Sequence, residues 1–246
     1  MRVPITPPPK SGNIIPAPPA RADWLLYACR TAYAAEVIEI IWRTGGCSSV
    51  LVDNLPDPPV CPLGPTVRPS DLTEAELRQP ALIPLITPGH RYQVEKEARA
   101  LGFLDFPPLI DPSTIVARTA SVGEGSIVNA QAMIGAQSRL GRFVHVNRSA
   151  SIGHDADIQD YVTLGPACVL AGNVTLETGC FIGAGAIIAP NVRIGANVIV
   201  SAGAVVLQSV PPNVTLMGNP ARVVRTQSTG YGGVAIPVEV QKIFSI

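Results

Sequence analysis

The chain has 246 residues, no net formal charge at pH 7, and 47% hydrophobic but only 5% aromatic residues. This balance excludes the basic excess of a nucleic-acid-binding protein and the polybasic run of a membrane-surface protein. No apolar run reaches the roughly 20 residues that span a bilayer, and the start lacks the apolar segment of a signal peptide. Because the five cysteines are dispersed, we expect reduced thiols and a cytoplasmic location.

Proline dominates the beginning of the chain. Residues 1–20 contain seven prolines and few residues that could join a hydrophobic core. This composition is typical of disordered or polyproline-like segments. We therefore predict a disordered leader over residues 1–22.

The next segment has the pattern of a β-α-β unit. We predict a strand over 24–28, a helix from Thr31 to about Thr44, and a second strand over 49–53. The loop at 28–33 has none of the glycines of a dinucleotide fingerprint, so we expect no dinucleotide coenzyme. Asp53, at the end of the second strand, is either a ligand for a ribose or base or a solvated strand end.

Turn and cap signals complete a small α/β domain over residues 23–108. A proline-rich loop over 55–70 precedes a short helix over 71–77, where Glu74 is placed for a capping box. A third strand is predicted over 81–86, and a helix over 91–101 that ends at Gly102. We expect this domain to bind the substrate.

A strict six-residue repeat then occupies the chain from Val116 to Val206. All sixteen positions at this spacing are Val, Ile or Leu, which is the signature of a parallel β-helix. Three hexads make a triangular coil of 18 residues, so sixteen hexads predict about five coils, each rising roughly 4.8 Å. We therefore predict a Rossmann-like α/β domain, a β-helix over 109–226, and a C-terminal tail over 227–246 whose apolar part, 236–244, could dock.

The outward residues of the repeat sort onto three faces when they are compared every 18 positions. The three sets are Arg139, Asp157, Thr175, Arg193; Ser151, Val169, Ile187, Val205; and His145, Thr163, Phe181, Ile199. The first face is polar and the other two are partly apolar, which suggests partner surfaces. A cyclic trimer would cover both apolar faces, so we predict a homotrimer with its active site at the seam.

Histidine is the residue type that best suits catalysis here. His145 and His154 lie half a coil apart, so three imidazoles cannot converge on a zinc ion and we predict no metal. In His154-Asp155, a neutral imidazole could accept a proton from an amine or hydroxyl while the carboxylate orients it. An ordinary surface pair is the alternative, and residue type alone favours that alternative.

Residues 109–225 resemble the hexapeptide-repeat sugar acetyltransferases that modify UDP-4-amino sugars, perosamine and sialic acid. The resemblance rests on Val146-Asn147, Ile152-Gly153-His154-Asp155, and the segments 181–186, 201–206 and 218–221. An α/β domain that precedes the β-helix also fits this family. The resemblance implies a left-handed β-helix and favours a catalytic His154.

The resemblance also implies roles for particular residues. His154 would be the general base, Asp155 its orienting acid, and Asn147 part of the acceptor pocket. Acetyl-CoA would lie between adjacent prisms, touched at Thr163 and by the backbone of Ala184 and Ala202. In relatives the loop after the first strand is glycine-rich, contains a His and holds the nucleotide part of a sugar nucleotide. Here that loop is residues 28–33, in which Arg30 could pair with a phosphate, while the β-α-β pattern makes Asp53 the candidate ligand for a ribose or base.

The resemblance therefore implies an acetyl-CoA-dependent acetyltransferase. The acceptor would be an amino or hydroxyl group of a sugar, with a nucleotide-linked sugar favoured, and transfer would be direct. One alternative is an acyltransferase with a non-nucleotide acceptor. The other is a non-catalytic β-helix that binds or scaffolds.

Overall fold

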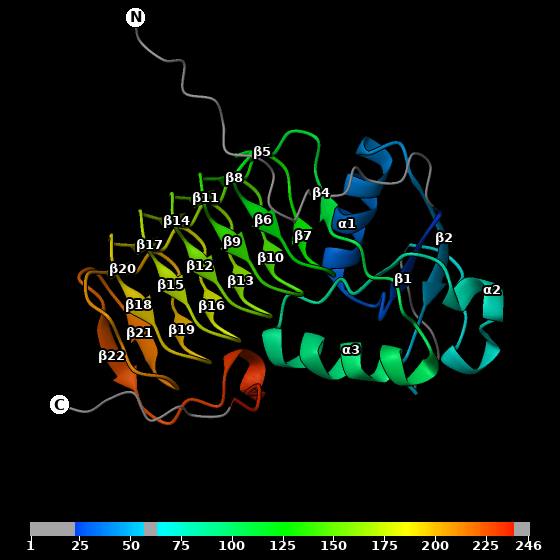
Figure 1. The fold of residues 1–246 in the computed structure, drawn as a ribbon. Helices are drawn as coiled ribbons and strands as arrows, with labels where there is room; N and C mark the ends of the chain where they lie inside the picture. The colour runs from blue at the N-terminus through cyan, green and yellow to red at the C-terminus, as the bar shows by residue number, and fades with distance from the viewer. Residues whose placement is uncertain (1–22, 57–62, 239–246) are drawn as a thin grey trace, which may run out of the picture.

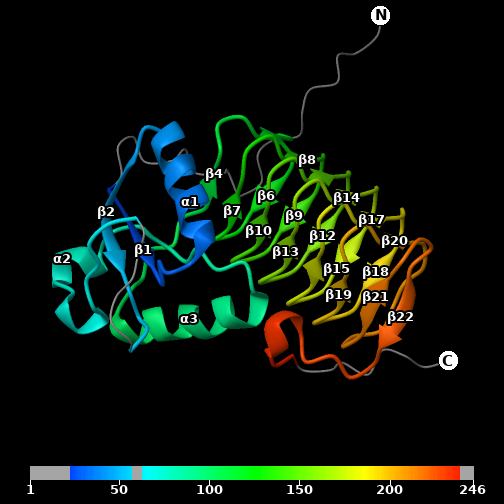
Figure 2. The ribbon, with the colours of Figure 1, turned by 180° about the vertical axis from the view of Figure 1, so that it is seen from behind.

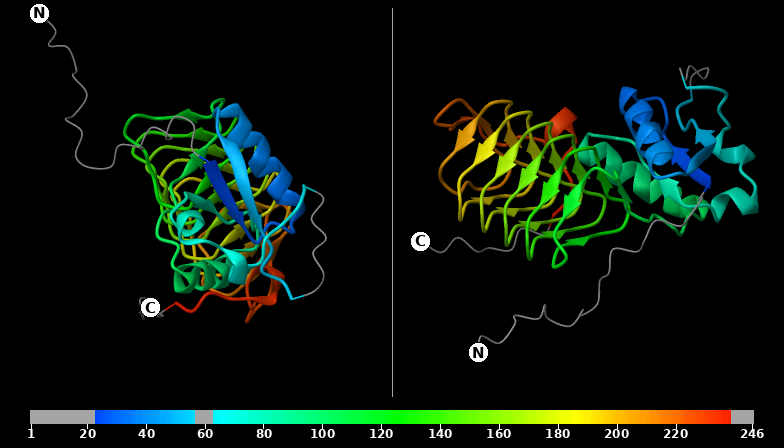
Figure 3. Two further views of the ribbon diagram at one scale, coloured as in Figure 1. Left: turned by 90° about the vertical axis from the view of Figure 1, so that its right-hand side faces the viewer. Right: turned by 90° about the horizontal axis from the view of Figure 1, so that it is seen from above.

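A computed structural model describes residues 23–56 and 63–238 (Figure 1). The described chain forms a small parallel α/β sheet followed by a parallel β-solenoid, so the predicted fold class is confirmed. The α/β part lies at one end of the solenoid, as the right-hand view of Figure 3 shows. The predicted disordered leader and the last eight residues of the tail lie outside the described residues.

The N-terminal sheet contains three parallel strands in the order β2-β1-β3. The first β-α-β unit consists of β1 (Asp23–Tyr27), α1 (Ala32–Arg43) and β2 (Cys47–Val52). Thr31 caps α1 by accepting a hydrogen bond from the Ala34 backbone N–H at 3.2 Å, as predicted. Apolar residues on one side of α1, including Val37 and Ile41, are buried against the sheet.

The rest of this part differs from the prediction in detail. A 3₁₀ turn, η1 (Pro69–Asp71), precedes α2 (Glu74–Leu77), and the capping box uses Thr73 and Glu76 rather than Glu74. β3 is only Ala81–Leu82, because Pro84 has no backbone N–H for a longer strand. α3 (Pro88–Leu101) starts earlier than predicted, with a proline in its first turn, and ends at Gly102, whose φ is 106°.

The solenoid contains short parallel strands arranged in three sheets. Eighteen parallel strands, three to a coil, make six coils, because β4 and β21 add to the sixteen strands of the repeat. The strands are β4 (Leu109–Ile110), β5 (Ile115–Val116), β6 (Ser121–Val122), β7 (Ile127–Val128), β8 (Met133–Ile134), β9 (Arg139–Leu140), β10 (His145–Val146), β11 (Ser151–Ile152), β12 (Asp157–Ile158), β13 (Thr163–Leu164), β14 (Val169–Leu170), β15 (Thr175–Leu176), β16 (Phe181–Ile182), β17 (Ile187–Ile188), β18 (Arg193–Ile194), β19 (Ile199–Val200), β20 (Val205–Val206) and β21 (Thr215–Met217).

Each sheet makes one face of the prism, and the predicted 18-residue sorting is confirmed. His145 pairs with Thr163 in the sheet that contains β4, β7, β10, β13, β16, β19 and β21, here named the His145 face. Val169 pairs with Ile187 in the Val169 face, which contains β5, β8, β11, β14, β17 and β20. The Asp157 face contains β6, β9, β12, β15 and β18. The inward aliphatic residues form one buried column.

The His145 face is covered within the chain, which corrects the expectation that two apolar faces are open to partners. The Tyr33 ring of α1 lies 5.6 Å from the His145 ring, and α3 and its preceding loop cover Thr163. The Val169 face is open, because Ile115, Met133 and Ile187 are 67%, 45% and 43% exposed. One apolar face therefore remains available to a partner.

The C-terminal region returns along the His145 face. β21 pairs with the antiparallel β22 (Arg222–Arg225), and a 3₁₀ turn, η2 (Tyr231–Gly233), follows. Figure 2 shows this segment in red beside the N-terminal end of α3. The buried Ile236 side chain docks here, which confirms docking for this part of the tail. No described helix combines the length and the apolar character required to cross a membrane.

Candidate functional site

His154 and Asp155 occupy the corner between the Val169 face and the Asp157 face. His154 Nδ1 lies 2.6 Å from Asp155 Oδ2, and the two side chains are 69% and 47% exposed. A neutral imidazole that donates its Nδ1 proton to a carboxylate keeps an unprotonated Nε2. In that tautomer the pair presents a proton acceptor at the surface of the prism.

The next coil makes room for this imidazole at Gly172, which lies 18 residues after His154. A Cβ atom on Gly172 would stand 2.5 Å from His154 Nε2, so only glycine leaves the ring in place. Asp155 takes the left-handed corner conformation with φ of 55°, and this turns its carboxylate toward the ring. We did not single out Gly172 from the sequence, although the 18-residue spacing from His154 points to it.

Asn147, Ala184 and Ala202 lie along a different corner, between the His145 face and the Val169 face. Asn147 Oδ1 accepts a hydrogen bond from the Arg148 backbone N–H at 3.0 Å. Ala184 and Ala202 are exposed and occupy successive coils, and Gly203 N–H donates to Ala184 O at 2.9 Å. Within one chain, the full width of the Val169 face separates these residues from His154.

Thr163 does not fit the expected contact with acetyl-CoA. Its side chain is buried, and its hydroxyl donates to Ile86 O at 2.6 Å and accepts from Arg91 Nη2 at 3.0 Å. Both hydrogen bonds stay within the chain, because the loop before α3 closes over β13. The structure therefore gives Thr163 a role in joining the α/β part to the solenoid.

Asp53 and Arg30 are brought together at the carboxyl end of the N-terminal sheet. Arg30 donates to Asp53 Oδ2 from Nε at 2.8 Å and from Nη2 at 2.7 Å. Arg68 Nη1 lies 3.4 Å from the same oxygen. The Asp53 carboxylate is fully buried, so the solvated strand end considered above is wrong. Arg68 lies in a proline-rich loop, and no pattern in the sequence indicated that it would contact Asp53.

Arg91 is a further residue that sequence reasoning missed. It is fully buried on α3, where Nε donates to Phe143 O at 2.8 Å and Nη2 to Tyr161 O at 2.7 Å. Burial lowers the pKa of its guanidinium to about 9. Burial and the nearby Arg91 charge also hold the pKa of His145 well below its usual value. Arg91 therefore forms a polar contact between α3 and the solenoid.

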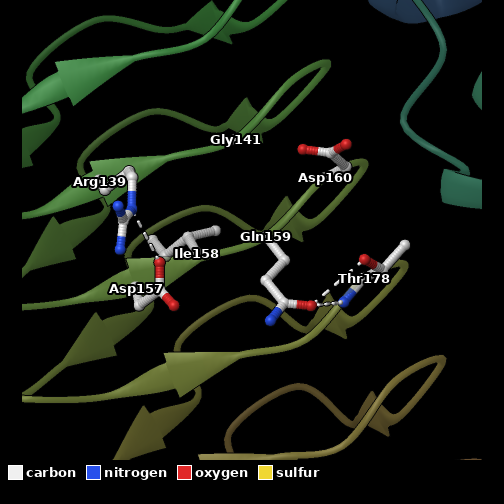
Figure 4. Close-up of a pocket in the computed structure, with 7 residues that line it drawn as sticks. All are labelled: Arg139, Gly141, Asp157, Ile158, Gln159, Asp160 and Thr178. Carbon is white, nitrogen blue, oxygen red and sulfur yellow. Dashed lines mark hydrogen bonds and ion pairs between the residues drawn. The ribbon is translucent and has the colours of Figure 1, made fainter. Parts of the chain in front are cut away.

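A shallow depression of about 310 Å³ lies on the Asp157 face, and none of the residues proposed for the site lines it (Figure 4). Arg139 Nε donates to Asp157 Oδ1 at 3.2 Å, and Gln159 Oε1 accepts from Thr178 N–H at 3.1 Å. These polar groups are satisfied by one another. Across the described ranges, no three His, Cys, Asp or Glu side chains gather in a way that could hold a metal ion.

Comparisons with known proteins agree with this architecture. Residues 173–208 match the family model described as bacterial transferase hexapeptide (six repeats). A variant of perosamine N-acetyltransferase from Caulobacter crescentus, solved with CoA and GDP-perosamine, is 32% identical with a TM-score of 0.76, and the match covers 82% of this chain and 96% of that chain.

Two other solved structures are similar over a comparable length. The acetyltransferase domain of PglB from Neisseria gonorrhoeae, in complex with acetyl coenzyme A, is 27% identical with a TM-score of 0.74, covering 83% of this chain and 100% of that chain. WeeI from Acinetobacter baumannii, 24% identical with a TM-score of 0.73 and covering 82% and 99%, supports the fold alone. The search of curated proteins found no significant match. The identity, the coverage and the repeat together show that this chain belongs to the hexapeptide-repeat transferase family and is an acyltransferase of that family.

Proposed function

We propose that this protein transfers an acetyl group from acetyl-CoA to an amino or hydroxyl group of a sugar. The observation that carries the proposal is the 2.6 Å contact between His154 Nδ1 and Asp155 Oδ2, which leaves Nε2 free to accept a proton. Similar proteins of this fold were solved with CoA and GDP-perosamine or with acetyl coenzyme A. A cytoplasmic location goes with this proposal, because acetyl-CoA is available there.

The proposed reaction is a direct transfer. The acceptor nitrogen or oxygen attacks the thioester carbonyl carbon while His154 Nε2 takes its proton. A backbone N–H of the coil holds the oxyanion that develops. The attack gives a tetrahedral intermediate. Its collapse breaks the C–S bond and releases the CoA thiolate, which takes the proton from the imidazolium of His154. No covalent acyl-enzyme is formed.

The arrangement of the site supports a homotrimer. His154 and the corner that carries Ala184 and Ala202 lie on opposite edges of the Val169 face, which is apolar and open. Packing this face against a neighbouring copy would bring the acetyl-CoA corner of one chain toward His154 of another. In this proposal residues 23–108 hold the acceptor and residues 109–226 hold acetyl-CoA.

A sugar without a nucleotide is the second candidate acceptor. The Arg30–Asp53 ion pair favours it, because the buried carboxylate already has guanidinium partners and would lose them on binding a ribose. A nucleotide-linked sugar stays the first candidate, since Arg30 lies where a phosphate would approach in an open α/β sheet.

One assay tests both candidates. Release of CoA from acetyl-CoA is measured against UDP-, GDP- and CMP-linked sugars and against free amino sugars. Release with a nucleotide-linked sugar supports the first candidate, and release with free sugars alone supports the second. If acetyl-CoA yields no CoA with any acceptor, the enzymatic proposal fails and a binding or scaffold role takes its place.

A further inference from the structure

The last described residues, 226–238, form a strap along the His145 face, here named the C-terminal strap. Asn197 fixes it with two hydrogen bonds to one residue: Nδ2 donates to Ile236 O at 3.0 Å, and Oδ1 accepts from Ile236 N–H at 2.9 Å. Farther back, Ser228 N–H donates to Asn213 O at 2.7 Å. The strap is therefore bonded to the solenoid at both ends.

Between these points the strap touches the first turn of α3. A Cβ atom on Gly89 would stand 2.1 Å from Val234 O, so the two backbones are in direct contact. Gly230, Gly232 and Gly233 all have positive φ, at 79°, 74° and 79°. These glycines allow the sharp turn that lays the Tyr231 side chain on the solenoid.

Tyr231 stacks flat on Phe181 of β16. The ring centroids are 3.5 Å apart and the planes differ by 2°. Phe181 comes three residues before Ala184, at the edge of the His145 face that leads into the corner carrying Ala184 and Ala202. Both aromatic residues are half-buried, so part of the stack remains open to solvent beside this corner.

We propose that the C-terminal strap forms the outer wall of the acyl-CoA groove and that the Phe181–Tyr231 stack contacts the pantetheine arm. This inference rests on the proposed function, in which that arm runs along Ala184 and Ala202. A pantetheine arm carries methyl and methylene groups between its amides, and a fixed aromatic surface buries such groups well. The hydrogen bonds of Asn197 keep this surface in place before the ligand binds, which limits the entropy lost on binding.

Calorimetric titration of acetyl-CoA into the full chain tests the contact. The variant Tyr231→Ala should raise the Kd roughly three- to tenfold, the effect of losing an aromatic contact. The KM for acetyl-CoA should rise by the same factor, while the KM for the acceptor stays unchanged. The matched control is Trp42→Ala, which removes a 60% exposed ring from α1 and should leave the Kd unchanged.

A second variant separates the contribution of the ring from that of its hydroxyl group. Tyr231→Phe keeps the flat ring and should recover the affinity that Tyr231→Ala loses. If the wild type and Tyr231→Ala bind acetyl-CoA with equal affinity, the strap does not contact the pantetheine arm, and the acetyltransferase proposal stays intact. If Tyr231→Phe binds as weakly as Tyr231→Ala, the ring does not make the contact. A wild-type protein that binds no acetyl-CoA would overturn both proposals.

Discussion

Gly172 lies against the imidazole of His154 from the next coil, where a Cβ atom would stand 2.5 Å from Nε2. The variant Gly172→Ala should therefore push the ring away from its present position. A displacement of about 1 Å can lower turnover by roughly 10²-fold, so we expect kcat to fall by roughly 10- to 100-fold. Steady-state kinetics measures this, and Pro190→Ala, in the same corner one coil further, is the control. Unchanged kcat in Gly172→Ala would show that the ring position seen here is not the reactive one.

Removal of the proposed base is the most direct test of the chemistry. His154→Ala should lower kcat by roughly 10²–10⁴-fold, the usual contribution of a general base, with little change in the affinity for acetyl-CoA. His90→Ala removes an exposed histidine from α3 and should retain wild-type kcat. Near-wild-type turnover of His154→Ala would remove this residue from the mechanism.

Arg91 should matter for stability more than for catalysis. Arg91→Met leaves Phe143 O and Tyr161 O without their buried donor, and we expect the free energy of unfolding to fall by roughly 3–5 kcal/mol. Urea unfolding followed by circular dichroism measures the loss. Arg78→Met, at an exposed position on α2's C-terminal side, should change stability by less than about 0.5 kcal/mol. Similar stability of the two variants would contradict this role of Arg91 in joining α3 to the solenoid.

His145 should make the protein less stable in acid. Burial holds its pKa well below the usual value in the folded state, and Arg91 lowers it further. Since the unfolded chain takes up a proton near pH 6.5 and the folded chain does not, this stabilisation is present above pH 6.5 and is lost as the pH falls. The loss is about 1.4 kcal/mol per pH unit below that point.

The variant His145→Leu isolates this contribution. The difference in unfolding free energy between wild type and variant should shift by about 1.4 kcal/mol against the wild type between pH 7.5 and 5.5. Tyr33, Arg91 and the other ionisable groups are common to both proteins, so they cancel in the comparison. A difference that does not vary with pH would mean that folding leaves the pKa of His145 unchanged, which would contradict its burial as a neutral ring.

The Val169 face offers a test of assembly. Ile187→Asp places a charge in the middle of this apolar surface, and burying it against another copy would be costly. We expect the wild type to be a trimer and this variant a monomer, as measured by light scattering coupled to size-exclusion chromatography. Thr175→Asp, on the polar Asp157 face, should leave the trimer intact. A trimeric Ile187→Asp would exclude this face from the interface.

The regular part of the fold could be predicted almost residue by residue. A hexapeptide repeat without insertions determines which residues point inward, and 18-residue spacing determines which lie side by side, as the pairing of His145 with Thr163 confirms. The helix from Thr31 and the stop at Gly102 followed from local cap chemistry. Local rules were therefore sufficient wherever the contacts were local or periodic.

Contacts between parts of the chain that are far apart in sequence could not be predicted. The burial of Thr163 depends on Ile86 and Arg91, which reach it from the loop before α3 and from α3 itself. The pairing of Asp53 with Arg30 depends on how the two loops meet at the edge of the sheet, and no short motif in the sequence specifies this pairing. The periodicity of the solenoid gave no information on which of its faces the α/β part would cover.

The contact between Val234 and Gly89 also sets an order of events during synthesis. These residues join the last turn of the described chain to the first turn of α3. α3 leaves the ribosome long before the strap, so its first turn stays uncovered while every coil is being added. The strap can cover this turn only after Val234 has been synthesised, so synthesis that stops between the last coil and Val234 leaves a solenoid whose α3 first turn is still uncovered.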